Sequence, residues 1–244
     1  MLSILGEMSI TSTLMHILAA VVPALVLMYY VYRKDRVEKE PGDLLFKLFL
    51  FGALSTIPAM VLEIASQYLE VNILTQVSAG AATAAIVDAT MVGIIEEACK
   101  FAALKKLSWK SPSFNYTFDG VVYAVFVSLG FAALENVLYI FQFGMSVALM
   151  RAVLSIPAHM AFSVYMGVYY GRAKYCEKRN NGEGKMWNLL AGYLMAVTLH
   201  AVFDGTLMVN SDLSVAIFFV FDVLMTIMVF RTLRNASRQD RPIH

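Results

Sequence analysis

Residues 117–142 read TFDGVVYAVFVSLGFAALENVLYIFQ, an apolar run in which only Asp119 and Glu135 carry a charge. A helix needs about 20 mostly apolar residues to cross the roughly 30 Å hydrocarbon core of a bilayer. The stretch therefore predicts a membrane-spanning helix. Asp119 lies near its start, and Glu135 with Asn136 lies deep within it.

The whole chain shares this apolar character. Its 244 residues are 59% hydrophobic and 15% charged, with a mean hydropathy of +0.66. Soluble domains are about 45–50% apolar and about 25% charged, so the composition indicates an integral membrane protein. We expect an all-α, polytopic membrane helix bundle of about seven transmembrane helices, forming a single domain over residues 1–244. The six further segments that are long and apolar enough to span are 11–32, 43–65, 78–106, 146–172, 186–209 and 213–232.

Nearly all the Lys and Arg residues lie in alternate connections between these segments. The basic stretches are 33–40, 105–110, 171–185 and 231–241. The connections without Lys or Arg are those around 66–77, 142–147 and 210–212. Because basic loops favour the cytoplasmic side of a membrane, we expect the N-terminus outside and the C-terminus in the cytoplasm. The protein is predicted to be a multi-pass protein of the cell membrane.

Other features of the composition exclude several classes of protein. The net charge of +1, with no single basic face, gives no case for a nucleic-acid partner. Cys99 and Cys176 form no disulfide or zinc-ribbon framework, so we expect reduced, inert thiols. The first ten residues, MLSILGEMSI, contain Glu7 and no Lys or Arg, which does not suit a cleavable signal peptide. They are predicted to form a short tail ahead of a retained first span.

Ionisable side chains inside the predicted spans need an explanation. Each costs about 2.5–3.5 kcal/mol on membrane-insertion scales. For Asp88, Asp119 and Asp222 we expect interface, helix-start and packing roles respectively. The residues that need a functional explanation are Glu96, Glu97, Lys100, Glu135, His159, His200 and Asp204.

Glu96, Glu97 and Lys100 share one helical face, because they are spaced i,i+4 and i,i+3. One interpretation is a self-neutralising ion pair that helps the helix insert. A single Glu–Lys pair explains one carboxylate and leaves the other without a partner. The second carboxylate is then a candidate general base, so an acid–base role is the alternative.

His200 and Asp204 are also i,i+4 and can converge on one metal ion or one substrate oxygen. Alternatively, Asp204 only orients a packed His200. Glu135 can bond to a neighbouring helix, and His159 can be an ordinary core histidine. Together, however, a Glu pair, a further Glu and two His residues on four central spans are the residue types that bind zinc and activate water.

These residues occur in an order that resembles the PrsW family of intramembrane proteases. That family lies within a wider group that includes the CAAX prenyl endopeptidases and bacteriocin-processing enzymes. The resemblance runs from about residue 33 to 209. Its motifs here are DRVEKEPGDLLFKLFLFGALSTIPAMVLE (35–63), EEACK (96–100), FDGVVYAVFVSLGFAALENVLY (118–139), AHMAFSVYMGVYYGRAK (158–174) and LHAVFDG (199–205). The motif residues are Glu96, Glu97, Lys100, Asp119, Phe131, Glu135, Asn136, His159, Gly167, Gly171, His200 and Asp204. Ala124 stands where the pattern favours Gly.

The resemblance implies peptide-bond hydrolysis within or near the membrane of a bacterial cell. The implied substrate is a membrane-bound regulator with a single span, such as an anti-sigma factor cut at a first site, and the other partner is the lipid bilayer. The oligomeric state stays open. A catalytic core over about 78–209 is expected.

The resemblance also implies roles for the site residues. Glu96 would activate water, while Glu97 and Lys100 tune its charge. The implied ligands of a Zn²⁺ ion, or of the attacking water, are Glu135, His159 and His200, with Asp204 as a fourth ligand or as the partner that orients His200. In a metal-free version, His200 and Asn136 would stabilise the oxyanion. Zinc-assisted and metal-free mechanisms both remain open.

Two other functions remain possible from the residues alone. An ion- or proton-coupled transporter would use the intramembrane Glu, His and Asp residues as a relay, although no internal repeat is visible. A catalytically silent membrane scaffold would keep the fold without the chemistry.

Within the predicted spans, Glu135, His200 and Asp204 lie somewhat beyond the midplane toward the outside. That depth predicts a cavity that opens to the outer face or sideways to lipid.

Overall fold

The computed structural model describes residues 10–76 and 80–244. In this part of the chain the regular structure is helical, and an isolated bridge pairs Tyr116 with Pro242. The elements are α2 (Ile10–Lys34), α3 (Gly42–Leu54), α4 (Thr56–Gln76), α5 (Ala81–Ser108), α6 (Asp119–Phe143), η1 (Met145–Val147), α7 (Ala148–Met150), η2 (Arg151–Ser155), α8 (Ile156–Lys178), α9 (Gly182–Val209) and α10 (Asp212–Arg238). The predicted all-α membrane bundle is confirmed.

Six stretches of the described chain are long and apolar enough to cross a membrane. They are Thr11–Lys34, Gly42–Thr75, Asp119–Phe143, Met145–Lys178, Gly182–Val209 and Asp212–Arg238. The seventh long helix, α5, has its Glu96, Glu97 and Lys100 side chains buried inside the protein. The count of about seven spans therefore includes one helix whose polar groups face its neighbours.

The second predicted span, 43–65, is divided in the structure. Helix α3 ends at Leu54 and α4 begins at Thr56, with the Ser55 hydroxyl donating to the Gly52 carbonyl at 2.6 Å. Pro58 has no N–H for the Leu54 carbonyl, which explains a break at this point. The prediction that 66–77 is a connection was wrong, because α4 continues to Gln76. Residue 77, like the predicted N-terminal tail up to residue 9, lies outside the described residues.

The fifth predicted span, 146–172, also starts irregularly. It begins with the 3₁₀ turn η1 and the short α7, and continues through η2, a π-helical turn over Arg151–Ser155. Regular α-helix starts only at Ile156, next to Pro157. Proline cannot donate to the preceding turn, and π-turns arise where the regular pattern of hydrogen bonds is interrupted.

Cys99 and Cys176 are both free thiols, as expected.

Helix α6 forms the centre of the bundle, with most of its side chains buried. Two neighbours approach it backbone to backbone. A Cβ atom at Gly130 would lie 2.1 Å from the Phe49 carbonyl oxygen of α3, and one at Gly167 of α8 would lie 2.7 Å from that of Gly120. Small residues therefore hold α3 and α8 against the helix that carries Glu135.

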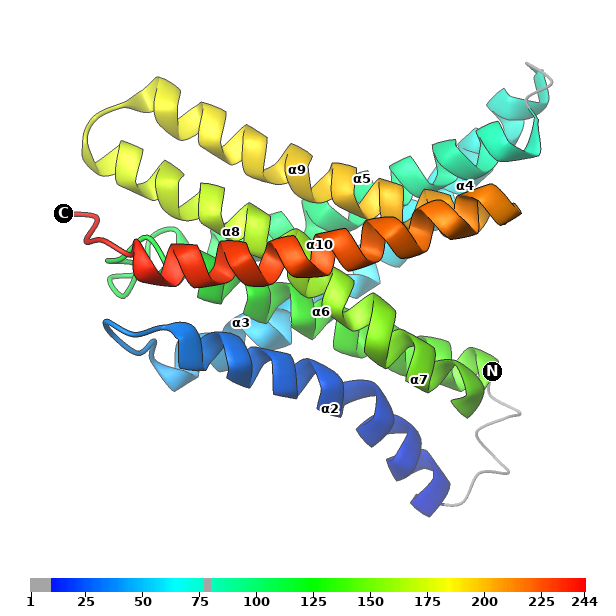
Figure 1. The fold of residues 1–244 in the computed structure, drawn as a ribbon, viewed down its shortest axis with the longest axis horizontal. Coiled ribbons are helices and arrows are strands. Elements are labelled where there is room, and N and C mark those ends of the chain that lie inside the picture. The colour runs from blue at the N-terminus through cyan, green and yellow to red at the C-terminus, as the bar shows by residue number, and fades with distance from the viewer. Residues whose placement is uncertain (1–9, 77–79) are drawn as a thin grey trace.

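The basic connections lie together at one end of the bundle (Figure 1). The α2–α3 and α8–α9 connections and the C-terminal end of α10 lie at the left of the view, and α5 and α10 begin at the right. This common placement matches the charge pattern of the sequence. The left-hand end, which carries these connections, is called the basic end. The orientation of the chain in the membrane stays a prediction.

Candidate active site

One turn of α5 places a lysine between two glutamates. Lys100 Nζ lies 3.0 Å from Glu96 Oε2 and 2.8 Å from Glu97 Oε1, and all three side chains are buried. The same nitrogen lies 3.0 Å from His159 Nδ1 of α8 and 4.3 Å from the centre of the Phe131 ring. The expectation that Lys100 satisfies only one carboxylate does not hold, because it contacts both.

His200 of α9 is surrounded by three carboxylates. Its Nδ1 lies 3.0 Å from Glu97 Oε1, and its Nε2 lies 3.2 Å from Asp204 Oδ2 and 3.8 Å from Glu96 Oε2. The predicted i,i+4 contact with Asp204 is present. Within the described chain, the second oxygen of Glu97, Oε2, is buried without a hydrogen-bond partner. The arrangement holds Glu97 firmly through its other oxygen, Oε1.

Glu135 of α6 pairs with His159. The His159 Nε2 atom lies 3.1 Å from Glu135 Oε2, and the His159 and His200 ring centres are 5.4 Å apart. Asn136 points away from this pair: its amide nitrogen donates to the Ala20 carbonyl of α2 at 3.3 Å. The structure therefore brings together every predicted site residue except Asn136.

Arg151 is a site residue that the sequence analysis missed. It donates from Nη2 to Glu135 Oε2 at 2.8 Å and from Nε to Asn136 Oδ1 at 2.6 Å. Its guanidinium carbon also lies 3.8 Å from the centre of the Tyr139 ring. A signal was available, because Arg151 is a lone basic residue at the predicted outer end of a span, where the positive-inside rule disfavours it.

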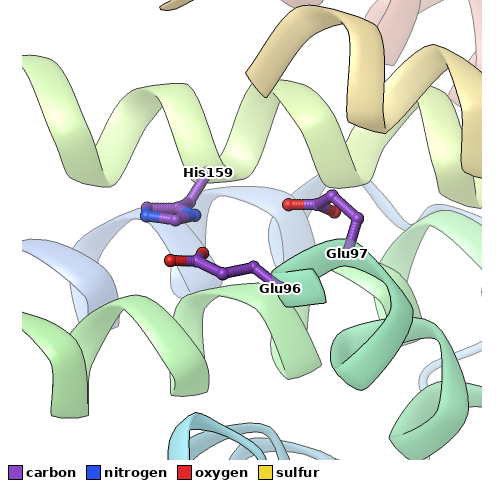
Figure 2. A group of neighbouring side chains, drawn as sticks. All are labelled: Glu96, Glu97 and His159. Carbon is purple, nitrogen blue, oxygen red and sulfur yellow. The ribbon is translucent and has the colours of Figure 1, made fainter. Parts of the chain in front are cut away.

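The residues can be tested against the needs of a metal ion. Figure 2 shows Glu96, Glu97 and His159 pointing toward one another, and one ligand atom from each lies within 4.8 Å of the others. Two carboxylates and an imidazole are ligand types that zinc accepts. The predicted set is arranged as two pairs, Glu135 with His159 and His200 with Asp204. The donor chemistry of these carboxylates and imidazoles fits a metal ion.

A cavity of about 540 Å³ adjoins these residues. It is lined by Glu96, Glu135, His159, His200 and Asp204, and also by Glu63 and Gln67 of α4 and Asp88 of α5. Glu97 and Lys100 do not line it. Asp88, for which an interface role was expected, faces this cavity. The C-terminal ends of α6 and α9 and the short α7 also line it, through Gln142, Phe143, Met150, Leu207 and Met208.

Known proteins match most of the chain. The model of the PrsW family intramembrane metalloprotease matches residues 40–232. Protease PrsW from Geobacillus kaustophilus is 36% identical over 190 residues, 78% of either chain, and Protease PrsW from Clostridioides difficile is 33% identical over 85% of either chain. Protease PrsW from Shouchella clausii is 32% identical over 91% of this chain and 97% of that protein. No solved structure matches. Six apolar helices, a buried Glu–His cluster and these relatives agree, so the chain belongs to the PrsW family and is a multi-pass intramembrane protease of a bacterial membrane.

Proposed function

We propose that the chain hydrolyses a peptide bond of a single-span regulatory membrane protein, such as an anti-sigma factor, with water activated by Glu96. The observation that carries the proposal is the difference between the two adjacent glutamates. Glu96 lines the cavity, whereas Glu97 is fully buried, with Oε1 held by Lys100 and His200. A general base must reach the water that it deprotonates. Glu96 meets that requirement, and Glu97 positions Lys100 and His200.

The other groups have separate tasks. Lys100 keeps both glutamates in place and supplies positive charge next to Glu96. His200 faces the cavity, and Glu97 orients it through Nδ1, so its Nε2–H, which contacts Asp204 here, would turn to donate to the oxyanion of the tetrahedral intermediate. Asn136 binds Arg151 and the α2 backbone, so we assign it to the positioning of Arg151.

A zinc ion would be held by His159 and His200 with a carboxylate from Glu135 or Glu96. The 5.4 Å between the two ring centres supports joint ligation by the histidines. When bound, such an ion supplies Lewis-acid polarisation of the scissile carbonyl and of water. Glu97, which contacts Nδ1, would orient His200 from its far side, as carboxylates commonly do for zinc-bound histidines, and Asp204, on the Nε2 side, is in place as a fourth ligand.

The lining and the position of the cavity support a membrane-embedded substrate. The polar groups lie beside the apolar side chains of Met60, Val92, Phe131 and Leu138, which suit the flank of a hydrophobic helix. The cavity extends toward the end of the bundle opposite the basic end. If that end faces outward, cleavage falls near the outer boundary of the membrane. The converging glutamates and histidines also favour catalysis over a silent scaffold or a transporter.

The test is cleavage of a panel of single-span regulators by the purified chain in proteoliposomes. Glu96→Gln should lower the cleavage rate by at least about 10²-fold, the usual contribution of a general base. Asp222→Asn, which changes a carboxylate of α10 outside the cavity, is the matched control and should cleave normally. Unchanged cleavage by Glu96→Gln would remove Glu96 from the mechanism.

A further inference from the structure

A second group of buried carboxylates lies outside the candidate active site. Asp35 and Glu40 belong to the α2–α3 connection, and Asp119 is the first residue of α6. The three residues are 2%, 5% and 1% exposed. One oxygen from each lies within 4.8 Å of the others. Three acids thus converge at the basic end of the bundle, and none of them lines the cavity described above.

Hydrogen bonds satisfy this acidic cluster only in part. Asp119 Oδ2 accepts from the backbone N–H groups of Asn115 at 3.0 Å and Tyr116 at 2.7 Å, as suits a residue at a helix start. Glu40 accepts from the Tyr123 hydroxyl. Asp35 is different: over the described residues, both of its carboxylate oxygens are buried without a hydrogen-bond partner.

The negative charge of the cluster also lacks a direct counter-ion. Among residues 10–76 and 80–244, no Lys or Arg forms an ion pair with any of the three carboxylates. The nearby Lys39 ammonium donates to the backbone carbonyls of Asp35 and Tyr32. Asp240 and Glu38 add further negative charge around Asp35. A buried carboxylate without compensation costs several kcal/mol, so we expect a positive partner that the described residues do not supply directly.

The protonation behaviour of the two loop acids agrees with this picture. Burial raises the pKa of Asp35 to about 6 and the pKa of Glu40 to about 7. Both pKa values therefore lie close to neutral pH, because the loss of water outweighs the attraction of Lys39 for Asp35.

We propose that Asp35, Glu40 and Asp119 form a binding site for a hard divalent cation, Ca²⁺ or Mg²⁺. The donors are all carboxylate oxygens, which these ions prefer, and the cluster offers none of the nitrogen or sulfur ligands that favour zinc. The site is thus chemically distinct from the Glu–His cluster of α5, α8 and α9. The two unpartnered oxygens of Asp35 are the ligand atoms that remain free to bind such an ion.

Such an ion would fasten two parts of the chain together, and hydrogen bonds attach a third part to them. The cluster joins the α2–α3 connection to the start of α6. The segment just before α6 is tied to the C-terminal tail, because Asp240 Oδ1 accepts from the Phe118 N–H at 2.8 Å and from the Thr117 hydroxyl at 3.1 Å. Since α6 carries Glu135, the cation would anchor the basic end of a helix that also builds the active site. The expected role is structural.

Terbium luminescence tests the site directly, because Tb³⁺ replaces Ca²⁺ and is sensitised by a nearby phenol. Tyr123, in contact with Glu40, is in place to act as that phenol. In the purified full chain in detergent, we expect saturable Tb³⁺ emission that excess Ca²⁺ or Mg²⁺ displaces. The more effective competitor identifies the ion. Asp35→Asn should weaken Tb³⁺ binding at least tenfold, whereas Asp43→Asn, which changes an exposed carboxylate in the first turn of α3, should leave it unchanged. Glu96→Gln should also leave it unchanged.

A stability measurement separates a cation site from an ordinary buried acid cluster. Ca²⁺ or Mg²⁺ should raise the Tm of the wild-type chain above its value in chelator, because a ligand that binds only the folded state stabilises it. Asp35→Asn should have a Tm in chelator at least equal to wild type and should lose the cation-dependent rise. Glu40→Gln gives a second test if Asp35→Asn does not fold. Emission that does not saturate, or emission and Tm that respond equally in wild type and Asp35→Asn, would overturn the proposal.

Discussion

Lys100 and His159 meet at the centre of the bundle, with Nζ 3.0 Å from Nδ1. Nζ also reaches Glu96 and Glu97, so a lysine ammonium directs its three protons to three different acceptors. His159 Nδ1 must then accept, which places the ring proton on Nε2, facing Glu135 Oε2 at 3.1 Å. A single amine therefore sets the charge next to the proposed base and, in the metal-free version, the tautomer of His159.

Replacing Lys100 should cost both stability and activity. In Lys100→Met, two buried carboxylates lose their shared counter-ion, and breaking a buried ion pair costs about 3–5 kcal/mol. Chemical unfolding in detergent measures that loss. The double variant Lys100→Met/Glu97→Gln removes one of the stranded charges and should recover part of the stability without recovering cleavage. A stable, active Lys100→Met would contradict the central role given to this amine.

Metal content should follow His159. The wild-type chain is expected to copurify with about one zinc ion, and a chelator such as o-phenanthroline should stop cleavage of a single-span substrate. His159→Gln should lose the metal, measured by elemental mass spectrometry. His16→Gln changes a histidine of α2 outside the cavity and should keep it. A metal-depleted chain that still cleaves would favour the metal-free version, with Glu96 and His200 acting alone.

Arg151 should behave as a positioning residue. Arg151→Gln removes the guanidinium that holds Glu135 and Asn136 together, so we expect kcat/KM for cleavage to fall about tenfold, equivalent to about 1.4 kcal/mol. Arg151→Lys should be intermediate, because lysine lacks the forked geometry that contacts both partners. Arg172→Gln changes an exposed arginine of α8 and serves as the control. A variant with faster cleavage would show that Arg151 obstructs Glu135 instead.

Gly130 should tolerate no side chain. In Gly130→Ala the new Cβ atom would lie 2.1 Å from the Phe49 carbonyl oxygen, so α3 and α6 must separate. Overpacking of this kind costs about 1–3 kcal/mol, seen as a lower Tm. Gly42→Ala adds the same methyl group where nothing lies within 4 Å and should leave the Tm unchanged. Equal values for the two variants would contradict the close backbone contact.

Local spacing was enough to predict the contacts within single helices. The i,i+3 and i,i+4 rules place Glu96, Glu97 and Lys100 on one face, and they place His200 next to Asp204. The apolar run of 117–142 gave α6 to within two residues at either end. These predictions succeed because they depend only on helix geometry and hydropathy.

Contacts between helices were less accessible. Asn136 was expected beside His200, but which face of α6 meets α2 is decided by packing, and its amide bonds to Ala20. Gln67 was missed because the prediction ended the second span at residue 65, and Glu63, although inside that span, was given no role. Pro58 and Pro157 mark the two irregular sites in the sequence, yet neither shows by itself whether the chain breaks or only changes its turn.

The division of the second span at Ser55 separates a helix that is packed tightly into the bundle, α3, from a helix that borders the cavity, α4. On one side of it, α3 is locked against α6 through Gly52 and Gly130. On the other side, α4 contributes Glu63 and Gln67 to the cavity while much of its surface, including Ile64 and Tyr68, faces outward. Helix α4 therefore forms a wall between the cavity and the outer surface of the bundle. We infer that a substrate helix entering from the lipid would displace α4 and leave α3 and α6 in place.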